Sequence, residues 1–506
     1  MQPIVTLKNV TKTYRINQQS KNVLEDISLE IWPQEFILLR GDNGSGKTTL
    51  VNLIAGLQSP DKGEITVFRK SPRNPDSRLQ FGIMLQRAKP VENLKVYETI
   101  NLFRSYYPQP LETQDVLKRT RLTEKQNDEA TTLAGGQAQS LYFALAIVGN
   151  PDLLVLDEPT NNLSVEARQN FWQQVREFYS QGKTIIVISH SQQDCDELQD
   201  IVTRELKLSL DNGRVEETIL KPEKYESIKS PNSQEKINSD FTESANTTIS
   251  SINLKALWGQ FYVEMLQVIR KVDLVLVSLS LAILLGFFTT KQVPSPEQFR
   301  AIISMALAGL VLFISVNQFC VKIASERDRG WLKLLRITPL SFSTYLAAKV
   351  GTFLVLVLSS ITFAVGTGWL ASVIYHREIG FGFWLINLTL TLLLGVIPFA
   401  IIGFCLGYFF KSESLQWVTL ILIAFAGFTL GLDLDTLGMP QWSQDIIPYS
   451  PIYHYTQLIA WVGHVNILPF YKFDGYSFLH IQWLLWWTVV GSLLARWVYF
   501  RERLSG

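Results

Sequence analysis

Charged residues and cysteines are both scarce in this 506-residue chain. Lys, Arg, Asp and Glu make up 18% of it, and the formal net charge is +1. A nucleic-acid-binding protein usually carries a clear basic excess, so the composition argues against that class of partner. The three cysteines, Cys195, Cys320 and Cys405, lie far apart and follow no metal or redox spacing, which excludes a disulfide framework. The opening "MQPIVTLKNVTKTY" lacks the basic patch and apolar run of a secretory signal, so we expect the first 200 residues or so in the cytosol.

The sequence divides into two halves of different character. The length allows about two to four domains. Up to about residue 215, near-continuous apolar runs such as "EFILLRG", "FGIMLQ", "LLVLDEP" and "KTIIVISH" alternate with helical patterns. Such runs are typical of parallel strands covered by helices on both faces, which predicts a soluble α/β domain over residues 1–215. Residues 216–253 are too polar to bury a core and predict a flexible linker.

An amphipathic helix is predicted at 254–271, directly before the first long apolar run. Its apolar residues recur at helical spacing, with Lys255, Gln260, Glu264, Gln267 and Arg270 opposite. A core helix of a soluble domain has the same pattern. The neighbouring span favours a helix at the membrane interface.

Six long apolar stretches follow, each close to the ~20 residues needed to cross a bilayer. They lie near 272–290, 301–322, 347–375, 384–410, 415–432 and 478–499. Six spans return both ends of the domain to one side. Lys and Arg are richer on the face that includes Arg270, Arg327 and Arg501, which predicts that the N- and C-termini are cytoplasmic. The proline-broken segment 433–479 predicts short helices at the outer leaflet.

A glycine-rich loop, "GDNGSGKT" at Gly41 to Thr48, stands between a predicted strand and a predicted helix. This G-x-x-x-x-G-K-[ST] pattern in that context is specific for a phosphate-binding loop. Its glycines allow backbone N–H groups to face phosphates at a helix N-terminus. We expect Lys47 to bind the β- and γ-phosphates and the Thr48 hydroxyl to bind magnesium. A chance glycine-rich turn is the alternative.

Further polar residues follow the ends of the other predicted strands. Asp157 is placed to bind magnesium, and Glu158 beside it to polarise an attacking water. Gln86 ends "FGIMLQ" and is a candidate ligand of the metal, while His190 ends "VISH" and is a candidate contact of the γ-phosphate. Each alone is also an ordinary residue at a strand end, and Asp157 with Glu158 is also compatible with a solvated carboxylate pair.

A second glycine pair opens a predicted helix just before "LLVLDEP". In "TLAGGQAQSL", Gly135 and Gly136 offer backbone donors to an anion, followed by Gln137. On its own this is a weak signal.

In this order and spacing, the first 215 residues resemble the nucleotide-binding domain of ATP-binding-cassette (ABC) transporters. The resemblance implies a P-loop ATPase domain with a parallel-sheet core and a helical signature subdomain. It implies that ATP and Mg²⁺ bind here, that Glu158, His190 and Lys47 act in catalysis, and that Thr48, Gln86 and Asp157 bind the metal. The nucleotide-binding set that it implies comprises Tyr14, Gly41, Asn43, Gly44, Ser45, Gly46, Lys47, Thr48, Thr49, Gln86, Gly135, Gly136 and Gln137. Tyr14 is the expected platform for adenine; core packing is the alternative for this residue.

The same resemblance implies pairing of two chains. In the family, nucleotide lies between the P-loop of one domain and the signature of another, and this chain contains one of each. It departs from the pattern at Ala134, where a signature serine is usual, and at Ser164, where a D-loop aspartate is usual. Both losses fall on the surface expected to face the partner, so we expect hydrolysis to be retained but slowed in a homodimer. A homologous half-transporter with its own serine and aspartate would make the pair asymmetric.

The second half resembles the type-2 membrane domain of ABC exporters, an all-α domain of six spans. The pattern E-R-x-x-G-x-L-K followed by T-P-L, from Glu326 to Leu340, carries this resemblance. It implies a cytosolic helix that docks on the nucleotide-binding domain through Glu326, Arg327 and Arg329.

Together the two resemblances predict a dimeric half-transporter in the plasma (bacterial inner) membrane. It would hydrolyse ATP to move an amphipathic, lipid-like or drug-like substrate, with membrane lipids around it. The alternative is a membrane ATPase without cargo, either ATP-gated or mechanotransmitting. The substrate and the identity of the partner chain are not readable from the sequence.

Overall fold

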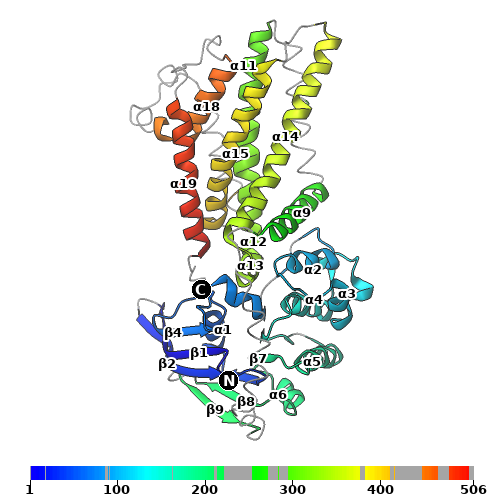
Figure 1. Ribbon diagram of the computed structural model, residues 1–506, viewed down its shortest axis with the longest axis vertical. Coiled ribbons are helices and arrows are strands. Elements are labelled where there is room, and N and C mark those ends of the chain that lie inside the picture. Colours follow the sequence, from blue (N-terminus) through cyan, green and yellow to red (C-terminus); the bar gives the residue numbers. More distant parts are fainter. Residues whose placement is uncertain are drawn as a thin grey trace. The chain divides into compact units, whose positions relative to one another are not determined.

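The computed structural model describes residues 2–16, 19–85, 89–90, 92–161, 163–209, 213–221, 253–271, 283, 295–376, 382–410, 415, 447–464 and 478–500 (Figure 1). The chain forms two compact units. The first comprises residues 1–263 and 329–345 with the last three residues, and the second comprises 264–328 and 346–503.

Two sheets build the first unit. A three-stranded antiparallel sheet has the order β2-β1-β4, and a six-stranded sheet has the order β5-β6-β7-β3-β8-β9. The strands are β1 (Val5–Ile16), β2 (Gln19–Ile31), β3 (Phe36–Gly41), β4 (Lys62–Val67), β5 (Phe81–Met84), β6 (Leu153–Asp157), β7 (Thr184–Ile188), β8 (Arg204–Leu208) and β9 (Val215–Ile219). From β5 to β8 all neighbours are parallel, and β9 is antiparallel to β8. The four apolar runs of the sequence are thus four of the five neighbouring parallel strands, β5, β6, β7 and β3.

Helices cover both faces of the larger sheet. The helices of the first unit are α1 (Lys47–Ile54), α2 (Val96–Arg104), α3 (Thr113–Arg119), α4 (Gly135–Ile147), α5 (Val165–Tyr179) and α6 (Gln192–Leu198). Of these, α2 and α3 pack with each other and with α4. Alternate residues of β3 enter two cores: Ile37 and Leu39 pack with α1 and the smaller sheet, while Phe36 and Leu38 pack with α4 and α5. The period of two in a strand produces this division. Because every residue of β6 and β7 is buried, the carboxyl ends of the parallel strands are held rigidly.

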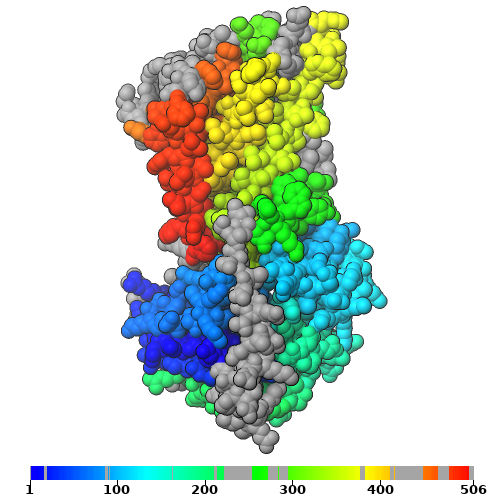
Figure 2. All heavy atoms as spheres, in the orientation of Figure 1, coloured from blue at the N-terminus to red at the C-terminus, as the bar shows by residue number. Residues whose placement is uncertain are grey.

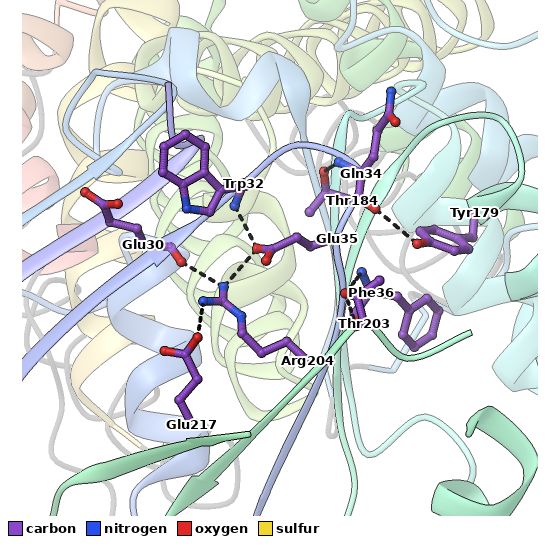
Figure 3. Close-up of polar contacts among 10 residues, drawn as sticks. All are labelled: Glu30, Trp32, Gln34, Glu35, Phe36, Tyr179, Thr184, Thr203, Arg204 and Glu217. Atoms are coloured by element: carbon purple, nitrogen blue, oxygen red, sulfur yellow. Dashed lines mark hydrogen bonds and ion pairs between the residues drawn. The ribbon is translucent and has the colours of Figure 1, made fainter. Parts of the chain in front are cut away.

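A buried ion pair fixes the start of β3 to β8 (Figure 3). Arg204 donates to the Glu35 carboxylate at 2.8 Å and to the Glu30 carbonyl at 2.7 Å, and its other terminal nitrogen reaches Glu217 at 3.0 Å. Glu35 also accepts from the Trp32 N–H at 2.8 Å. Both charges of the central pair are almost completely buried, so each depends on the other for compensation.

The second unit is helical. It contains α11 (Pro296–Leu312), the π-helical turn η5 (Phe313–Gln318), α12 (Phe319–Asp328), α14 (Phe342–Ile374), α15 (Phe383–Phe409), α18 (Pro451–Val462) and α19 (Phe478–Phe500), with α14 beginning in the first unit. Four helices of the described chain are long and apolar enough to cross a membrane: 296–328, Phe342–Ile374, Phe383–Phe409 and Phe478–Phe500. They coincide with four of the six predicted spans. The other two, near 272–290 and 415–432, lie almost entirely outside the described residues.

Helix α15 packs against α11, α12, α18 and α19 (Figure 1). Two glycines one turn apart permit close contact with its neighbours. A Cβ at Gly403 would stand 3.0 Å from the carbonyl oxygens of Ser315 and Val316, and one at Gly407 would stand 2.4 Å from that of Cys320. Small residues at such spacing let membrane helices approach through their backbones. In contrast, α14 and α19, which lie at the visible surface in Figure 2, carry many exposed apolar side chains, as a lipid-facing surface requires.

Helix α9 (Leu254–Arg270) forms where the amphipathic helix was predicted, and the middle of its polar side is buried, while Lys255 and Arg270 near its ends are exposed. Gln260 and Glu264 are each 2% exposed, whereas Leu254 is 77% and Trp258 69% exposed. Gln260 is buried because its side-chain oxygen accepts from the Tyr106 hydroxyl, at 2.5 Å. A helix with its apolar side outward is stable when that side meets lipid, which fits a position at the membrane interface.

Three buried charges and the partly buried Lys322 form an alternating chain inside the second unit. Lys349 on α14 lies 2.7 Å from Glu264 and 2.6 Å from Glu326 on α12, and Lys322 pairs with the second oxygen of Glu264. Lys349 is 1% exposed. Glu326 was expected on the docking surface, but the ion pair that the structure shows for it is internal.

Helix α13 (Trp331–Ile337) belongs by sequence to the second half and by packing to the first unit. The Trp331 ring lies edge-on to Phe103 of α2 at 5.4 Å, and Ile337 enters the core that includes α1. Arg329 pairs with Glu92, and its carbonyl accepts from the Lys89 N–H at 3.0 Å. Of the three expected docking residues, Arg329 therefore makes the contact.

Arg327 does not make such a contact in the described chain. It donates to the carbonyls of Gly407 and Tyr408 at the end of α15, and pairs with Asp328. The guanidinium thus satisfies carbonyls that the last turn of a helix leaves without intrahelical donors.

Candidate functional site: a P-loop with an acidic strand end

The glycine-rich loop leaves β3 and enters α1 with its backbone in conformations that favour glycine. Gly41 has φ 150° and Gly46 has φ 102°. A Cβ at Gly41 would stand 2.5 Å from the Leu208 carbonyl oxygen and 2.7 Å from Ser45 Oγ, so no side chain fits there. The space that these glycines keep free is a cradle of backbone atoms around the start of α1.

Two polar groups are gathered in this cradle. Lys47 Nζ donates to the carbonyls of Gly41 and Asp42 at 2.7 and 2.9 Å. Ser45 Oγ is buried and has no hydrogen-bond partner among the described residues. Thr48 is exposed and Thr49 half-buried in the first turn of α1. An ammonium group, an unpartnered hydroxyl and a helix N-terminus fit a polyphosphate.

The acidic end of β6 lies next to this lysine. Burial lowers the pKa of Lys47, and the charges of Glu158, Asp157 and Asp42 oppose that shift. Asp157 is 3% exposed. Burial, with the neighbouring Glu158, raises the pKa of Asp157 to about 6, against the pull of Lys47. A buried carboxylate near a hydroxyl-bearing helix start offers oxygen ligands that suit Mg²⁺.

This raised pKa predicts proton competition for the metal. In the metal-free fold the neutral carboxyl is favoured, so its contribution to stability is present below the pKa of the unfolded chain and is lost as pH rises to about 6. Mg²⁺ needs the ionised form. We therefore expect Mg²⁺-dependent ATP binding to weaken by about tenfold per pH unit below pH 6. Titrations of ATP binding against Mg²⁺ at pH 5, 6 and 7 measure it.

Asp157→Asn separates this group from the protonation of ATP itself. The variant should bind the metal weakly. The dependence of its ATP affinity on pH should be only the part that protonation of the nucleotide causes. An identical slope in both proteins would contradict the assignment.

Glu158 and His190 face each other across the ends of β6 and β7. Glu158 Oε1 lies 3.2 Å from His190 Nδ1, and Glu158 Oε2 accepts from Asn161 Nδ2 at 2.5 Å. The Glu158 N–H donates to the Ile188 carbonyl at 3.0 Å, which holds the residue at φ 49°. A non-glycine residue in this left-handed region costs about 1–3 kcal/mol, and such strain is concentrated at functional sites.

The second glycine pair begins α4 on the surface of the same unit. Gly135 is exposed, and a Cβ at Gly136 would stand 3.1 Å from Ala167 Cβ of α5. Among the described residues, no hydrogen bond or ion pair joins residues 134–137 to the loop at 41–48. The backbone donors of Gly135 and Gly136 thus make no described bond to this chain's own cradle.

The two departures have different local consequences. Ala134 begins α4 without a side-chain cap, and the Gln137 side chain bonds back to its N–H at 3.4 Å. Ser164 caps α5 by accepting from the Ala167 N–H at 3.3 Å. Serine therefore keeps the capping function at 164 while lacking the carboxylate expected there.

The remaining expected residues lie around this centre. Tyr14 on β1 is half-buried, with its hydroxyl donating to Gln58 at 2.7 Å. Gln86 lies outside the described residues. A cavity of about 450 Å³ opens beside the loop, lined by Arg40, Gly41, Asp42, Asn43, His190, Glu205 and Lys207. Sequence reasoning missed Asn161, which bonds the Glu158 carboxylate, and Asp194, which bonds Thr160 and Ser189.

A P-loop, a glycine-led helix, an acidic strand end and a histidine on the neighbouring strand, in this order on a parallel sheet, define an ATP-binding cassette. Residues 24–161 match the ABC transporter family, and residues 155–497 match the ABC-2 family transporter proteins.

The relatives agree with this class. An uncharacterized ABC transporter ATP-binding protein of Mycobacterium tuberculosis is 32% identical over 38% of this chain and 82% of its own length. The Nod factor export ATP-binding protein I of Cupriavidus metallidurans is 29% identical over 39% of this chain and 66% of its own. A solved dimeric ATP-binding cassette bound to ADP and Pi is 26% identical, with a TM-score of 0.39 over 43% of this chain and 98% of the other.

The chain belongs to the ABC transporters, as a cassette fused to an ABC-2 membrane domain. It binds ATP and couples ATP hydrolysis to transport, and it is an integral membrane protein.

Proposed function

We propose that the protein is a half-transporter that works as a dimer and exports an amphipathic, lipid-like or drug-like substrate. The observation that carries this proposal is the separation of the two glycine-led donor groups. The cradle at 41–48 and the start of α4 share no hydrogen bond or ion pair in the described chain, and Gly135 is exposed. A second chain that presents its own α4 start would complete each site.

Within this dimer, each side chain has a distinct role in hydrolysis. Lys47 binds the β- and γ-phosphates, Glu158 polarises the attacking water, and His190 both orients Glu158 and contacts the γ-phosphate. Tyr14 stacks on adenine. Thr48, Gln86 and Asp157 hold Mg²⁺, which neutralises phosphate charge when bound. The Glu158–His190 distance of 3.2 Å supports a joint role.

The packing of α13 in the first unit supports the coupling part of the proposal. The segment between two apolar helices carries Trp331 and Ile337 into the cassette fold. Displacement of α2 would therefore move a segment that continues covalently into α12 and α14. In this scheme both termini lie in the cytoplasm, and α9 lies in the inner membrane interface.

Export is the direction we favour, because several relatives are named as ATP-binding proteins of Nod factor export. The described spans carry few charges, and α14 and α19 expose apolar rows. A pathway with such walls suits a substrate with a large apolar part better than a small ion.

Reconstitution in liposomes tests the proposal. The purified chain is examined for its oligomeric state, and its ATPase is then measured with and without fluorescent phospholipid and with the dye Hoechst 33342. We expect a dimer, stimulation by at least one of these amphiphiles, and ATP-dependent movement of that probe across the bilayer. A fully active monomer, or nucleotide-driven ATPase with no movement of either probe, would count against it.

Restoring the signature hydroxyl should increase activity. Ala134→Ser gives α4 a cap worth about 0.5–2 kcal/mol. It also adds one hydrogen bond to the partner's nucleotide, worth about 0.5–1.5 kcal/mol, or up to roughly tenfold in rate. Thermal unfolding and ATPase of the dimer measure the two effects. Ala138→Ser, inside the same helix, is the control and should give neither gain.

A further inference from the structure

Asp194 is a buried carboxylate that none of the proposed steps of hydrolysis uses. It lies in the first turn of α6, four residues after His190, and is 1% exposed. Its neighbours Cys195 and Leu198 pack into the core formed by α4, α5 and one face of the larger sheet. An aspartate is placed there at a desolvation cost, so the groups that compensate it define its role.

Three hydrogen-bond donors and one cation meet the Asp194 carboxylate. Oδ2 accepts from Thr160 Oγ1 at 2.7 Å and from Ser189 Oγ at 2.6 Å. Oδ1 accepts from Trp172 Nε1 at 3.1 Å, and Arg168 Nε forms an ion pair with it at 3.7 Å. Both hydroxyls thus bond one oxygen, while the indole bonds the other. A carboxylate, which only accepts, suits three donors and a cation better than an amide does.

The two hydroxyl donors come from the loops that carry the catalytic pair. Thr160 follows Glu158 by two residues, next to Asn161, which bonds the Glu158 carboxylate. Ser189 directly precedes His190, and its Oγ also accepts from the Ser191 N–H at 3.1 Å. Residues on both sides of His190 are therefore tied to the same carboxylate that ties the loop after Glu158.

We propose that Asp194 is a positioning residue for ATP hydrolysis: it holds the loop 159–161 and the turn 189–191 in the register that sets the Glu158–His190 contact. This rests on the catalytic roles proposed above for Glu158 and His190. Thr160 lies four residues before Ser164, the cap of α5, and shares Asp194 Oδ2 with Ser189. A partner chain that binds at Ser164 and displaces Thr160 would therefore also displace Ser189 and the neighbouring His190.

The test compares four variants of the full-length dimer. Asp194→Asn keeps the side-chain volume and removes the charge. Ser189→Ala and Thr160→Val each remove one of the two hydroxyl groups that donate to Asp194. Asp196→Asn, on the exposed side of α6, is the matched control. Steady-state ATPase, ATP affinity and thermal unfolding are measured for each, beside Glu158→Gln and His190→Ala.

We expect Asp194→Asn to lower kcat about 10- to 100-fold, as misplacement of a catalytic pair does, with the KM for ATP changed by less than about twofold. Asp196→Asn should match the unaltered protein. Adding Ser189→Ala to Asp194→Asn should cause no further loss, because both act on one contact. Asp194→Glu should regain part of kcat.

Three results would overturn the proposal. The first is a kcat in Asp194→Asn within twofold of the unaltered protein while Glu158→Gln is inactive. The second is equal losses of kcat and ATP affinity that follow a lower unfolding temperature, which indicate a purely structural residue. If Asp194→Asn does not fold, the test uses Ser189→Ala instead. The third contradicting result is then an unchanged kcat in Ser189→Ala. Full activity of Glu158→Gln would instead refute the catalytic roles themselves, so the two failures are distinguishable.

Discussion

Glu158→Gln should nearly abolish ATP hydrolysis while leaving ATP binding intact. General-base catalysis contributes about 10²- to 10⁴-fold, so kcat should fall by that factor. The amide is nearly isosteric, and its oxygen can still accept from Asn161, which donates to Glu158 at 2.5 Å. The loop should therefore keep its shape. ATP affinity should change little, because the P-loop and Lys47 are untouched.

A second consequence of this variant concerns Asp157. Glu158 contributes to the raised pKa of Asp157, which is about 6. Removing the negative charge should lower that pKa and shift the onset of Mg²⁺ binding to lower pH. Glu166 is an exposed carboxylate in the first turn of α5, and Glu166→Gln is the control for charge alone. It should change neither the pKa of Asp157 nor the pH at which Mg²⁺ begins to bind. Unaltered hydrolysis in Glu158→Gln would refute the assignment of the base.

Lys349→Met should be the most destabilising substitution in the second unit. The ammonium joins Glu264 at 2.7 Å and Glu326 at 2.6 Å, and all three side chains are at most 5% exposed. Glu264 retains Lys322, but Glu326 loses its described ion-pair partner. Breaking a buried pair from one side costs about 3–5 kcal/mol. In detergent we expect an unfolding temperature lower by on the order of 10 °C.

A double-mutant cycle identifies the cause of that loss. Lys349→Met combined with Glu326→Gln removes one of the two carboxylates that faced the lost ammonium, so it should regain part of the lost stability. Lys255→Met, an exposed lysine on α9, should shift the unfolding temperature little. Additive losses in the double variant would show that lost packing, rather than an isolated charge, explains the effect.

Local chemistry explains why much of the nucleotide site was readable in advance. The loop from Gly41 to Thr48 is continuous in sequence, and parallel strands bring their carboxyl ends to one edge. Asp157 and His190 therefore had to lie near Lys47 once β3, β6 and β7 were neighbours. Asp194 was invisible for the opposite reason. A helical aspartate is ordinarily solvated, and only the fold brings Thr160 and Ser189 to its carboxylate.

The charged segment after the second apolar helix shows the same limit. Glu326 and Arg327 look like surface residues in the sequence, because the pattern contains no sign of their partners. Lys349 lies 23 residues further on, and the carbonyls of Gly407 and Tyr408 lie about 80 residues away. Helix α9 was predicted correctly as a helix, but which side it buries depends on Tyr106 and on the charge chain of the second unit. Composition alone could not distinguish lipid from protein as the neighbour of its apolar side.

Ile337 has a practical bearing on how the ATPase is isolated. This side chain is 3% exposed in a core otherwise built from residues 4–208. A fragment that ends before the linker would therefore lack Ile337 and leave a gap in this core. We expect such a fragment to be less soluble than the whole chain and to unfold at a lower temperature. A cassette fragment prepared for work in solution should include residues 329–345. They can be added as a separate peptide or fused to the chain after β9.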